Sequence, residues 1–374
     1  MSRRSTAKHD DKAHLRTGFT TSACAAGATR AALRALQEEQ PQRSVTIPLP
    51  GQRRASFVLA RCDVLLTGVR VGIVKDAGDD PDVTHGAEIQ ATVRFTDTPG
   101  IHYKAGPGVG VVTLPGLEIA VGEPSISPGA RRIIQRAVIA ELGQDFLRYQ
   151  GVHITLSVPG GETIARETLN PRLGVVDGIS ILGTTGIVVP FSEGAYRGSI
   201  VVEIKAALRN GVGELALTTG DRSERYLMAQ RPHWPEIAFI QVGDFLGFAL
   251  KRAARLGATG LTISGMIGKL SKIAQGRMHT HVSRGLIDID FISSLTTTLT
   301  PPPSPELLAR LRRANTARHI QMQLRKAGIT GLEQRIADVA AQQAAAHIDY
   351  AAPVEVFLWD IKGELLAYAA VAGR

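Results

Sequence analysis

The sequence lacks the features that would place the protein outside the cell or in a membrane. It has only two cysteines in 374 residues, Cys24 and Cys62, fewer than a secreted protein of this length usually carries. No apolar run is long enough to cross a bilayer, and residues 1–16 are polar, without the apolar stretch of a signal peptide. These absences predict a cytoplasmic protein in a reducing compartment, without a membrane partner.

Aromatic residues are also scarce, at 5% of the sequence, although the chain is basic, with a formal net charge of +9. A basic surface attracts polyanions as different as nucleic acids, anionic lipids and small polycarboxylates. Few aromatic residues and no known binding motif argue against a nucleic-acid partner. Residues 310–326 carry no acidic residue, and there we favour a solvated helix face over a binding patch. The basic residues of this segment are Arg310, Arg312, Arg313, Arg318, Arg325 and Lys326.

Length and patterning predict two or three domains after a disordered tail at residues 1–13. Thr21 or Ser22 is expected to cap a helix that runs to about residue 39, and Ser127 to cap a helix at 128–142. Alternating apolar residues predict strands at 44–49, 55–63, 69–75, 88–97 and 152–158.

The second half of the chain has the order of strand, glycine-rich turn and helix that is typical of a parallel α/β sheet. Strands are expected at 179–182 and 261–264, helices at 248–256, 304–327 and 331–346, and a hairpin at 354–360 and 363–370. We therefore predict an α/β fold with an α+β first domain (14–175), a Rossmann-like second domain (176–300) and C-terminal helices with a hairpin (301–374) that pack on them.

The densest polar cluster is an acidic loop, residues 75–86, with four carboxylates within seven residues: Asp76, Asp79, Asp80 and Asp82. One interpretation is an exposed acidic turn. A second is a divalent metal site, although the spacing does not match a twelve-residue calcium loop. A third is catalytic, because crowding raises the pKa of a carboxyl group and makes it a better base.

Two glycine-rich segments follow the expected strands of the second half, and we call residues 183–186 the first glycine turn and residues 265–269 the second. Glycines allow a backbone to approach a ligand closely, at the place where α/β folds bind nucleotides. Neither turn has the G-x-G-x-x-G pattern, so an ordinary tight turn is the alternative. The candidate cofactor-binding residues are Gly183, Thr184, Thr185, Gly186, Gly265 and Gly268.

Small hydroxyl residues precede the first expected helix, where free amides and the helix dipole can hold an anion. Simple capping is the alternative, and we expect Cys24 to be a buried small residue within that helix. His279 and His281 flank Thr280 and face the same side of an extended segment, but no third metal ligand is evident. A polar site or a solvated loop is therefore the favoured interpretation.

Five segments, in order between about residues 15 and 284, resemble the CbiD family, the cobalt-precorrin-5B methyltransferases of anaerobic cobalamin biosynthesis. They read LRTGFTTSACAAGA, KDAGDDPDVTHGA, GVGVVTLPGLEIAVGEPSISPGARRII, GISILGTTGIVVPFSEGAY and SGMIGKLSKIAQGRMHTH. The sequence departs from the family at residues 217–225, where members often have a Pro-Gly-Asn type segment, and the likeness thins after residue 301.

The resemblance implies methyl transfer from S-adenosylmethionine to carbon 1 of cobalt-precorrin-5B, giving cobalt-precorrin-6A. It also implies a two-domain α/β architecture unlike that of the usual tetrapyrrole methylases. Cobalt arrives within the polycarboxylate substrate, so no protein-bound metal is required, and a carboxylate of the acidic loop is expected to accept a proton. The candidate substrate-binding residues are Arg16, Thr17, Thr20, Thr21, Ser22, Lys75, Lys269, His279 and His281.

Two other functions compete with this hypothesis. A nicotinamide-dependent reductase would use the glycine turns, but the missing G-x-G-x-x-G argues against it. A basic nucleic-acid-binding protein would explain only the positive net charge. The sequence does not give the oligomeric state and is compatible with a homo-oligomer.

Overall fold

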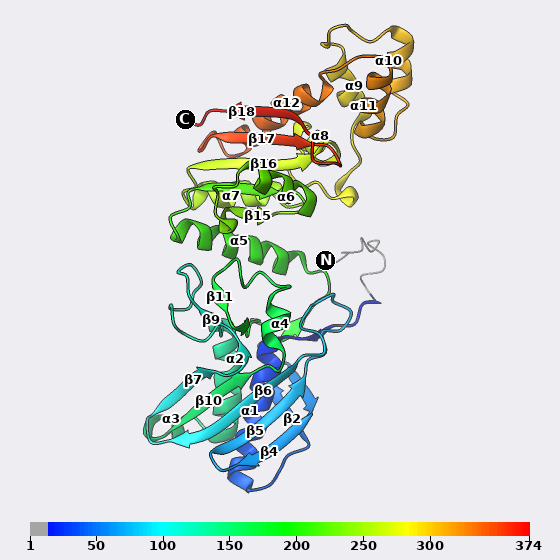
Figure 1. The fold of residues 1–374 in the computed structure, drawn as a ribbon. Helices are drawn as coiled ribbons and strands as arrows, with labels where there is room; N and C mark the ends of the chain where they lie inside the picture. The colour runs from blue at the N-terminus through cyan, green and yellow to red at the C-terminus, as the bar shows by residue number, and fades with distance from the viewer. Residues whose placement is uncertain (1–13) are drawn as a thin grey trace. The chain divides into compact units, whose positions relative to one another are not determined.

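The computed structural model describes residues 14–374, and the chain divides into two compact units, one ending at Ser192 and one running from Glu193 to Arg374 (Figure 1). The structure places this division after Ser192 and not at residue 175, and it assigns residues 301–374 to the second unit. The expected tail at residues 1–13 lies outside the described part of the chain.

A five-stranded sheet with two helices on one face forms the centre of the first unit. Its strand order is β4-β5-β6-β10-β7, antiparallel except between β10 and β7. The strands are β4 (Arg61–Leu65), β5 (Gly68–Val74), β6 (Glu88–Thr96), β10 (Gly151–Ser157) and β7 (Gly100–Ala105). Alternate residues of β10 (Val152, Ile154 and Leu156) are buried, as expected for a sheet covered on one face.

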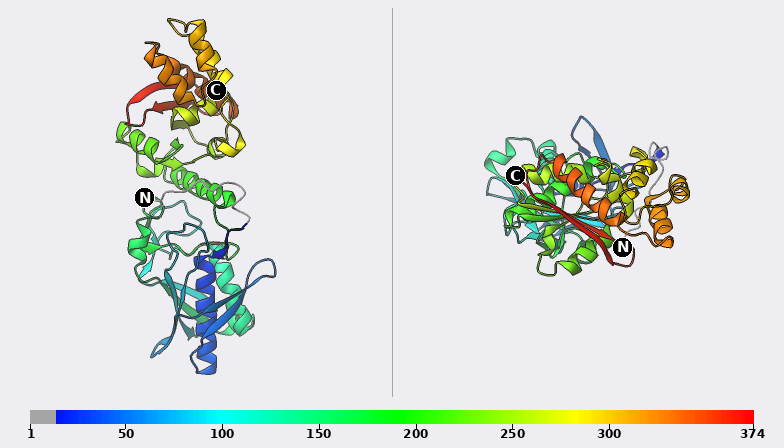
Figure 2. Two further views of the ribbon diagram at one scale, coloured as in Figure 1. Left: turned by 90° about the vertical axis from the view of Figure 1, so that its right-hand side faces the viewer. Right: turned by 90° about the horizontal axis from the view of Figure 1, so that it is seen from above.

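The covering helices are α1 (Thr21–Glu38) and α2 (Pro128–Leu142), which lie side by side (Figure 2). Helix α1 packs closely on the sheet because its buried face is mostly alanine. At Gly27 even a β-carbon would come within 2.8 Å of Cδ1 of Ile73. Helix α2 begins as predicted, with Ser127 as cap and Pro128 in the first turn, whereas Thr20 and not Thr21 or Ser22 caps α1.

The segment at residues 175–188 belongs to the first unit because its short strands pair there. Strand β11 (Val175–Val176) pairs with β9 (Val111–Val112), β12 (Gly178–Ile179) with β8 (Gly108–Val109), and β13 (Ile187–Val188) with β1 (Gly18–Phe19). The strand expected at 179–182 is therefore wrong, since only Ile179 lies in a strand. The remaining elements of this unit are β2 (Ser44–Pro48), β3 (Arg54–Val58), α3 (Phe146–Tyr149) and α4 (Gly161–Ala165).

The second unit contains a five-stranded sheet in the order β15-β14-β16-β17-β18. All neighbours are parallel except β17 and β18, which form the predicted C-terminal hairpin. The strands are β14 (Glu214–Thr218), β15 (Phe239–Gln241), β16 (Gly260–Met266), β17 (Val354–Trp359) and β18 (Leu365–Val371). From β14 the chain continues to β15, which lies on one side of β14, and then crosses to β16, which lies on the other side. The direction in which successive strands are added to the sheet therefore reverses between β14 and β16.

Helices connect these strands and pack beside them. They are α5 (Glu193–Arg209), α6 (Asp221–Gln230), α7 (Leu246–Arg255), α8 (Ile267–Ala274), α9 (Ile289–Thr296), α10 (Pro305–Leu311), α11 (Ala317–Lys326) and α12 (Leu332–His347), with short 3₁₀ turns η2 (Glu236–Ala238) and η3 (Val282–Arg284). The single helix expected at 304–327 is wrong, because Thr316 caps a new helix, α11, by accepting a hydrogen bond from N of His319.

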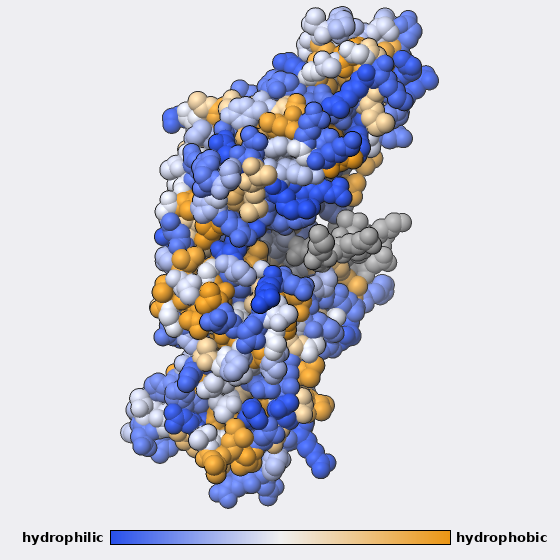
Figure 3. All heavy atoms as spheres, in the orientation of Figure 1, coloured by the Kyte–Doolittle hydropathy of each residue, from blue (hydrophilic) through white to orange (hydrophobic). Residues whose placement is uncertain are grey.

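Segment 310–326 has its basic residues on the surface and apolar residues in the interior. All six basic residues of segment 310–326 are exposed, while Leu311, Ile320 and Leu324 in the same segment are buried. In the view of Figure 3, apolar residues form small groups and not one large patch. Among residues 14–374, none of the helices is long and apolar enough to cross a membrane.

Candidate functional site

The acidic loop is held by an ion pair between a buried lysine and one of its aspartates. Lys75 is 1% exposed, and its Nζ donates to Oδ2 of Asp82 at 2.7 Å. Oδ1 of Asp82 accepts from both N and Oγ1 of Thr84, at 2.8 and 2.7 Å. Burial acts to raise the pKa of Asp82, but the charge of Lys75 and these hydrogen bonds outweigh it, so the pKa lies below its usual value.

The other three aspartates anchor the loop to distant parts of the first unit. Arg16 pairs with Asp76 through its guanidinium, and its backbone N donates to Oδ2 of Asp79 at 2.6 Å. Oδ1 of Asp80 accepts from N of Phe191 at 2.9 Å. The hydrogen bond from Arg16, with one from N of Gly78, lowers the pKa of Asp76 to about 2.

These contacts favour the structural interpretation of Asp76 and Asp82. A raised pKa was the condition for a crowded carboxylate base, and both groups have a lowered pKa instead. Among the described residues, no group of three or more His, Cys, Asp or Glu side chains is arranged to hold a metal ion. Lys75 is too deeply buried to reach a substrate, whereas Arg16 and Thr17 are exposed.

The hydroxyl groups at the start of α1 are used to join this helix to the first glycine turn. Oγ1 of Thr20 accepts from N of Ala23 at 3.2 Å and forms a 2.7 Å hydrogen bond with Oγ of Ser22. Oγ1 of Thr21 accepts from N of Leu182 at 2.9 Å, and Oγ of Ser22 donates to O of Gly183 at 3.2 Å. The structure therefore supports the capping interpretation of these residues.

Close packing explains the glycines of the first turn. Gly183 has φ +125°, and a β-carbon there would lie 2.6 Å from Cβ of Thr20. Gly186 has φ +81°, and its β-carbon would lie 2.5 Å from Cδ2 of Leu49. Oγ1 of Thr185 donates to O of Ile187 at 3.1 Å and closes the turn. The methyl group of Thr184 packs near Gly129.

Cys24 is fully buried in α1, as expected. Burial raises the pKa of its thiol to about 12. The thiol is therefore protonated and is not a nucleophile.

The second glycine turn lies where the parallel strands of the other sheet end. We call this the carboxyl edge, formed by the residues directly after β14, β15 and β16. The two glycine turns thus belong to different sheets. Gly265 lies so close to β14 that its β-carbon would come within 2.9 Å of Oγ1 of Thr219.

Lys269 joins the ends of the strands at the carboxyl edge. Its Nζ donates to O of Thr219 at 2.6 Å and to O of Gly243 at 3.1 Å, and it pairs with Oδ1 of Asp244 at 3.1 Å. Oδ1 of Asp244 also accepts from Oγ1 of Thr280 at 2.7 Å.

The two predicted histidines lie on either side of Thr280 at the same edge. Their rings are 6.5 Å apart, and the ring of His279 meets Phe245 edge-on at 4.9 Å. Nδ1 of His281 is 2.6 Å from Oγ of Ser283. The structure therefore brings together Lys269, His279 and His281, three of the residues predicted from the sequence.

Two glycines leave space at the carboxyl edge. Gly220, after β14, and Gly268, in the first turn of α8, have no atom within 4 Å of an added β-carbon. Neither α6 nor α8, which begin here, has a side chain capping its first amides. The sequence analysis did not include Gly220 or Asp244. The pattern that could have indicated them is a strand, a glycine, a helix, a second strand and an aspartate in succession.

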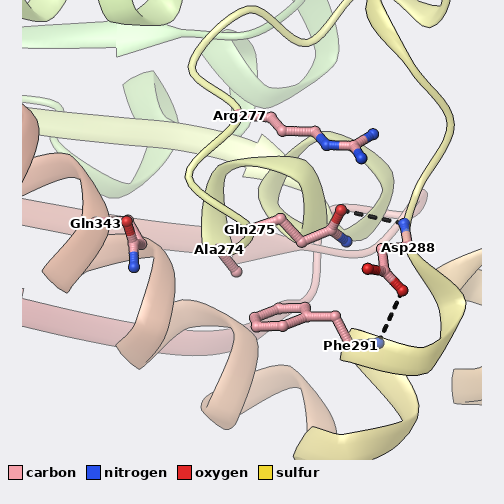
Figure 4. Close-up of a pocket in the computed structure, with 6 residues that line it drawn as sticks. All are labelled: Ala274, Gln275, Arg277, Asp288, Phe291 and Gln343. Carbon is pink, nitrogen blue, oxygen red and sulfur yellow. Dashed lines mark hydrogen bonds between the residues drawn. The ribbon is translucent and has the colours of Figure 1, made fainter.

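A separate small cavity lies at the other end of α8 (Figure 4). Its volume is about 200 Å³, and no residue predicted from the sequence lines it. Oε1 of Gln275 accepts from N of Asp288 at 3.1 Å, and Oδ1 of Asp288 accepts from N of Phe291 at 3.0 Å. The cavity is smaller than pockets that enclose nucleoside-sized ligands, about 300 Å³ or more.

Known proteins match almost the whole chain. The CbiD family model matches residues 8–190, and the CbiD C-terminal domain model matches residues 279–370. A relative from Geobacillus sp. (strain WCH70), named cobalt-precorrin-5B C(1)-methyltransferase, is 44% identical over 360 residues, which cover 96% of this chain and 98% of the relative. This chain belongs to the CbiD family.

Another relative and one solved structure are also similar to this chain. The relative of the same name from Salinispora tropica (strain ATCC BAA-916 / DSM 44818 / JCM 13857 / NBRC 105044 / CNB-440) is 46% identical over 317 residues, 85% of this chain and 82% of the relative. A crystal structure described as cobalamin biosynthesis protein (cbiD) from Archaeoglobus fulgidus is 29% identical, covers 72% of this chain and 83% of its own, and has a TM-score of 0.39.

Proposed function

We propose that this protein is a cobalt-precorrin-5B C(1)-methyltransferase that uses S-adenosylmethionine and forms cobalt-precorrin-6A in cobalamin biosynthesis. The observation that carries the proposal is the match to relatives of that name over up to 96% of the chain. We further propose that it acts in the cytoplasm without a protein-bound metal, since cobalt arrives in the substrate.

The carboxyl edge of the second unit is our proposed site for S-adenosylmethionine. Open α/β sheets bind ligands beyond the strand ends, where the strand order reverses, and here that place lies between β14 and β16. The residues present fit a nucleoside, because Gly220 and Gly268 leave open the space that side chains would fill. This arrangement supports a Rossmann-like second unit, unlike the usual tetrapyrrole methylase fold. The first glycine turn is the weaker candidate, because packing accounts for its glycines.

S-adenosylmethionine would supply an electrophilic methyl group to carbon 1 of the substrate: the bond from the methyl carbon to sulfur would break as the new carbon–carbon bond forms, and S-adenosylhomocysteine would leave. The main demand on the protein is alignment of the two molecules. We propose that the exposed residues Arg16 and Thr17 bind substrate carboxylates. In the acidic loop, Asp79 and Asp80 are the proposed proton acceptors, since each uses one oxygen in a hydrogen bond to backbone and has no described partner for the other.

The test is a methyl-transfer assay with purified protein, cobalt-precorrin-5B and methyl-labelled S-adenosylmethionine. We expect one label, at carbon 1, and no dependence on added NADH or NADPH. Transfer to another ring position, or none with verified substrate, would refute the proposal. Turnover that requires a nicotinamide would instead support the reductase hypothesis.

A further inference from the structure

We propose that Asp244 binds the ribose hydroxyls of the S-adenosylmethionine that occupies the carboxyl edge. This inference rests on the proposed function, and it names a residue that the sequence motifs did not include. Three features carry it: where Asp244 stands in the topology, which carboxylate oxygen is free, and how the side chain is held.

Asp244 stands just beyond the second strand of the first strand–helix–strand unit of the sheet. The chain leaves β14 at Thr218, passes Gly220 into α6 and returns along β15, which ends at Gln241. N of Val242 donates to O of Thr218, so the chain after β15 still follows β14 toward the carboxyl edge. In nucleotide-binding sheets of this kind, an acid after the second strand accepts the ribose hydroxyls of a ligand that lies on the glycine turn after the first.

The carboxylate of Asp244 has one engaged oxygen and one free oxygen. Oδ1 accepts from Oγ1 of Thr280 and pairs with Nζ of Lys269, while Oδ2 has no hydrogen bond to a described residue. The side chain is 27% exposed, so part of it is accessible to a ligand. Burial acts to raise the pKa of Asp244, but Lys269, Thr280 and His281 outweigh it and lower the pKa, which keeps the group ionised at neutral pH. An ionised carboxylate only accepts hydrogen bonds, as two neighbouring hydroxyl donors require.

The position of Asp244 is fixed before any ligand binds. Lys269 holds its carboxylate and also the carbonyl groups of Thr219 and Gly243, so one ammonium fixes the aspartate relative to β14. N of Thr280 donates to O of Asp244 at 3.1 Å, which adds a backbone contact to the side-chain one. A preorganised acceptor loses little conformational entropy on binding and contributes more to affinity.

Calorimetric titration with S-adenosylhomocysteine and with its 2′-deoxy and 3′-deoxy analogues tests the inference without the corrinoid substrate. We expect wild-type protein to bind at least one deoxy analogue about 10-fold more weakly than the parent, equivalent to about 1.4 kcal/mol. Asp244→Asn should bind S-adenosylhomocysteine about 10-fold more weakly and should no longer distinguish it from that analogue. The two losses should be non-additive, because they remove the same contact.

Asp221→Asn is the matched control. Asp221 is an exposed acid at the start of α6, paired with Arg225 at 3.1 Å, and its loss should leave both affinities unchanged. An equal loss in this variant would mean that only the charge of the edge matters, and would overturn the inference. So would wild-type affinity in Asp244→Asn, or equal binding of all three ligands by wild-type protein, a result that needs no variant. No binding of S-adenosylhomocysteine by wild-type protein would refute the proposed function itself.

Discussion

Lys75 is the largest side chain among the described residues that are almost completely excluded from solvent. Its ammonium group forms an ion pair with the carboxylate of Asp82. Removing Asp82 would leave a buried, unpaired ammonium, which is among the most destabilising changes known in protein interiors. We expect Asp82→Ala to lower the free energy of unfolding by about 3 kcal/mol at pH 7. Urea denaturation followed by circular dichroism measures this loss.

The same pair gives a pH dependence with a definite sign. The pKa of Asp82 is lowered in the folded state, so its contribution is complete above the unfolded value of 3.8 and is lost as the pH falls through the folded pKa. The difference between wild type and Asp82→Ala should therefore shrink at pH values below 3.8. The control is Asp63→Ala, whose pair with Arg70 is more than one-third exposed and should contribute less than about 1 kcal/mol. Equal losses in the two variants at pH 7 would contradict this account.

At this scale the sequence predicts residue types better than partners. The acidic loop is evident from spacing, but Arg16 and Phe191, which bind Asp79 and Asp80, lie 63 and 111 positions away. Because folding alone brings them together, spacing cannot show that these carboxylates are engaged. Asp244 was missed for a related reason: a single aspartate has no local signal, and the strands β14 and β15 before it were not predicted from the sequence.

At the scale of elements, the prediction succeeded where the signal is local. Ser127 and Pro128 show in the sequence where helix α2 begins, and Gly363 shows the turn of the β17–β18 hairpin. The prediction failed for the run at 179–182, because Ile179 lies in the short strand β12, which pairs with β8 of the first unit, and Leu182 is 54% exposed. N of Ile181 donates to O of Ser125, and O of Leu182 accepts from N of Ser22.

The two glycine turns differ in a way that a matched pair of variants measures. Gly183→Ala places a methyl group against Thr20 at positive φ, so we expect it to destabilise the protein by about 1–3 kcal/mol. Gly268→Ala meets no atom within 4 Å and lies in a helix, where alanine is favoured by up to about 1 kcal/mol. Its melting temperature should be unchanged or slightly higher.

The ligand affinities should show the opposite order. The methyl group of Gly268→Ala fills space proposed for the cofactor, so its affinity for S-adenosylhomocysteine should fall about 10-fold or more. Folded Gly183→Ala should bind the ligand as the wild type does. Differential scanning fluorimetry and calorimetric titration of both variants provide the readouts. Wild-type affinity in Gly268→Ala together with a loss in folded Gly183→Ala would transfer the cofactor to the first glycine turn.

At the scale of the whole molecule, the topology explains why the predicted domain boundary came too early. The predicted boundary lies at residue 175, but β11, β12 and β13 pair with strands of the first unit. The second unit begins only at α5, whose first residue is Glu193. The strand expected at 261–264 lies within β16 and is followed by helix α8, whereas the first glycine turn belongs to a different sheet.

The net charge of +9 gives a prediction that separates the two ligands. The corrinoid substrate carries many acetate and propionate groups, whereas S-adenosylhomocysteine is a zwitterion without net charge at neutral pH.

Raising the ionic strength from about 0.1 to 1 M shortens the screening length from about 10 to 3 Å and weakens attraction between exposed charges. We therefore expect the KM for cobalt-precorrin-5B to rise at least about threefold over this range, because we propose that exposed cations such as Arg16 bind its carboxylates. The affinity for S-adenosylhomocysteine, measured by calorimetry in the same buffers, should change less than about twofold, because the contacts proposed for Asp244 and the glycines of the carboxyl edge are with uncharged groups. A KM independent of salt would contradict electrostatic capture of the substrate, and competition by random duplex DNA at low salt would support the nucleic-acid-binding alternative.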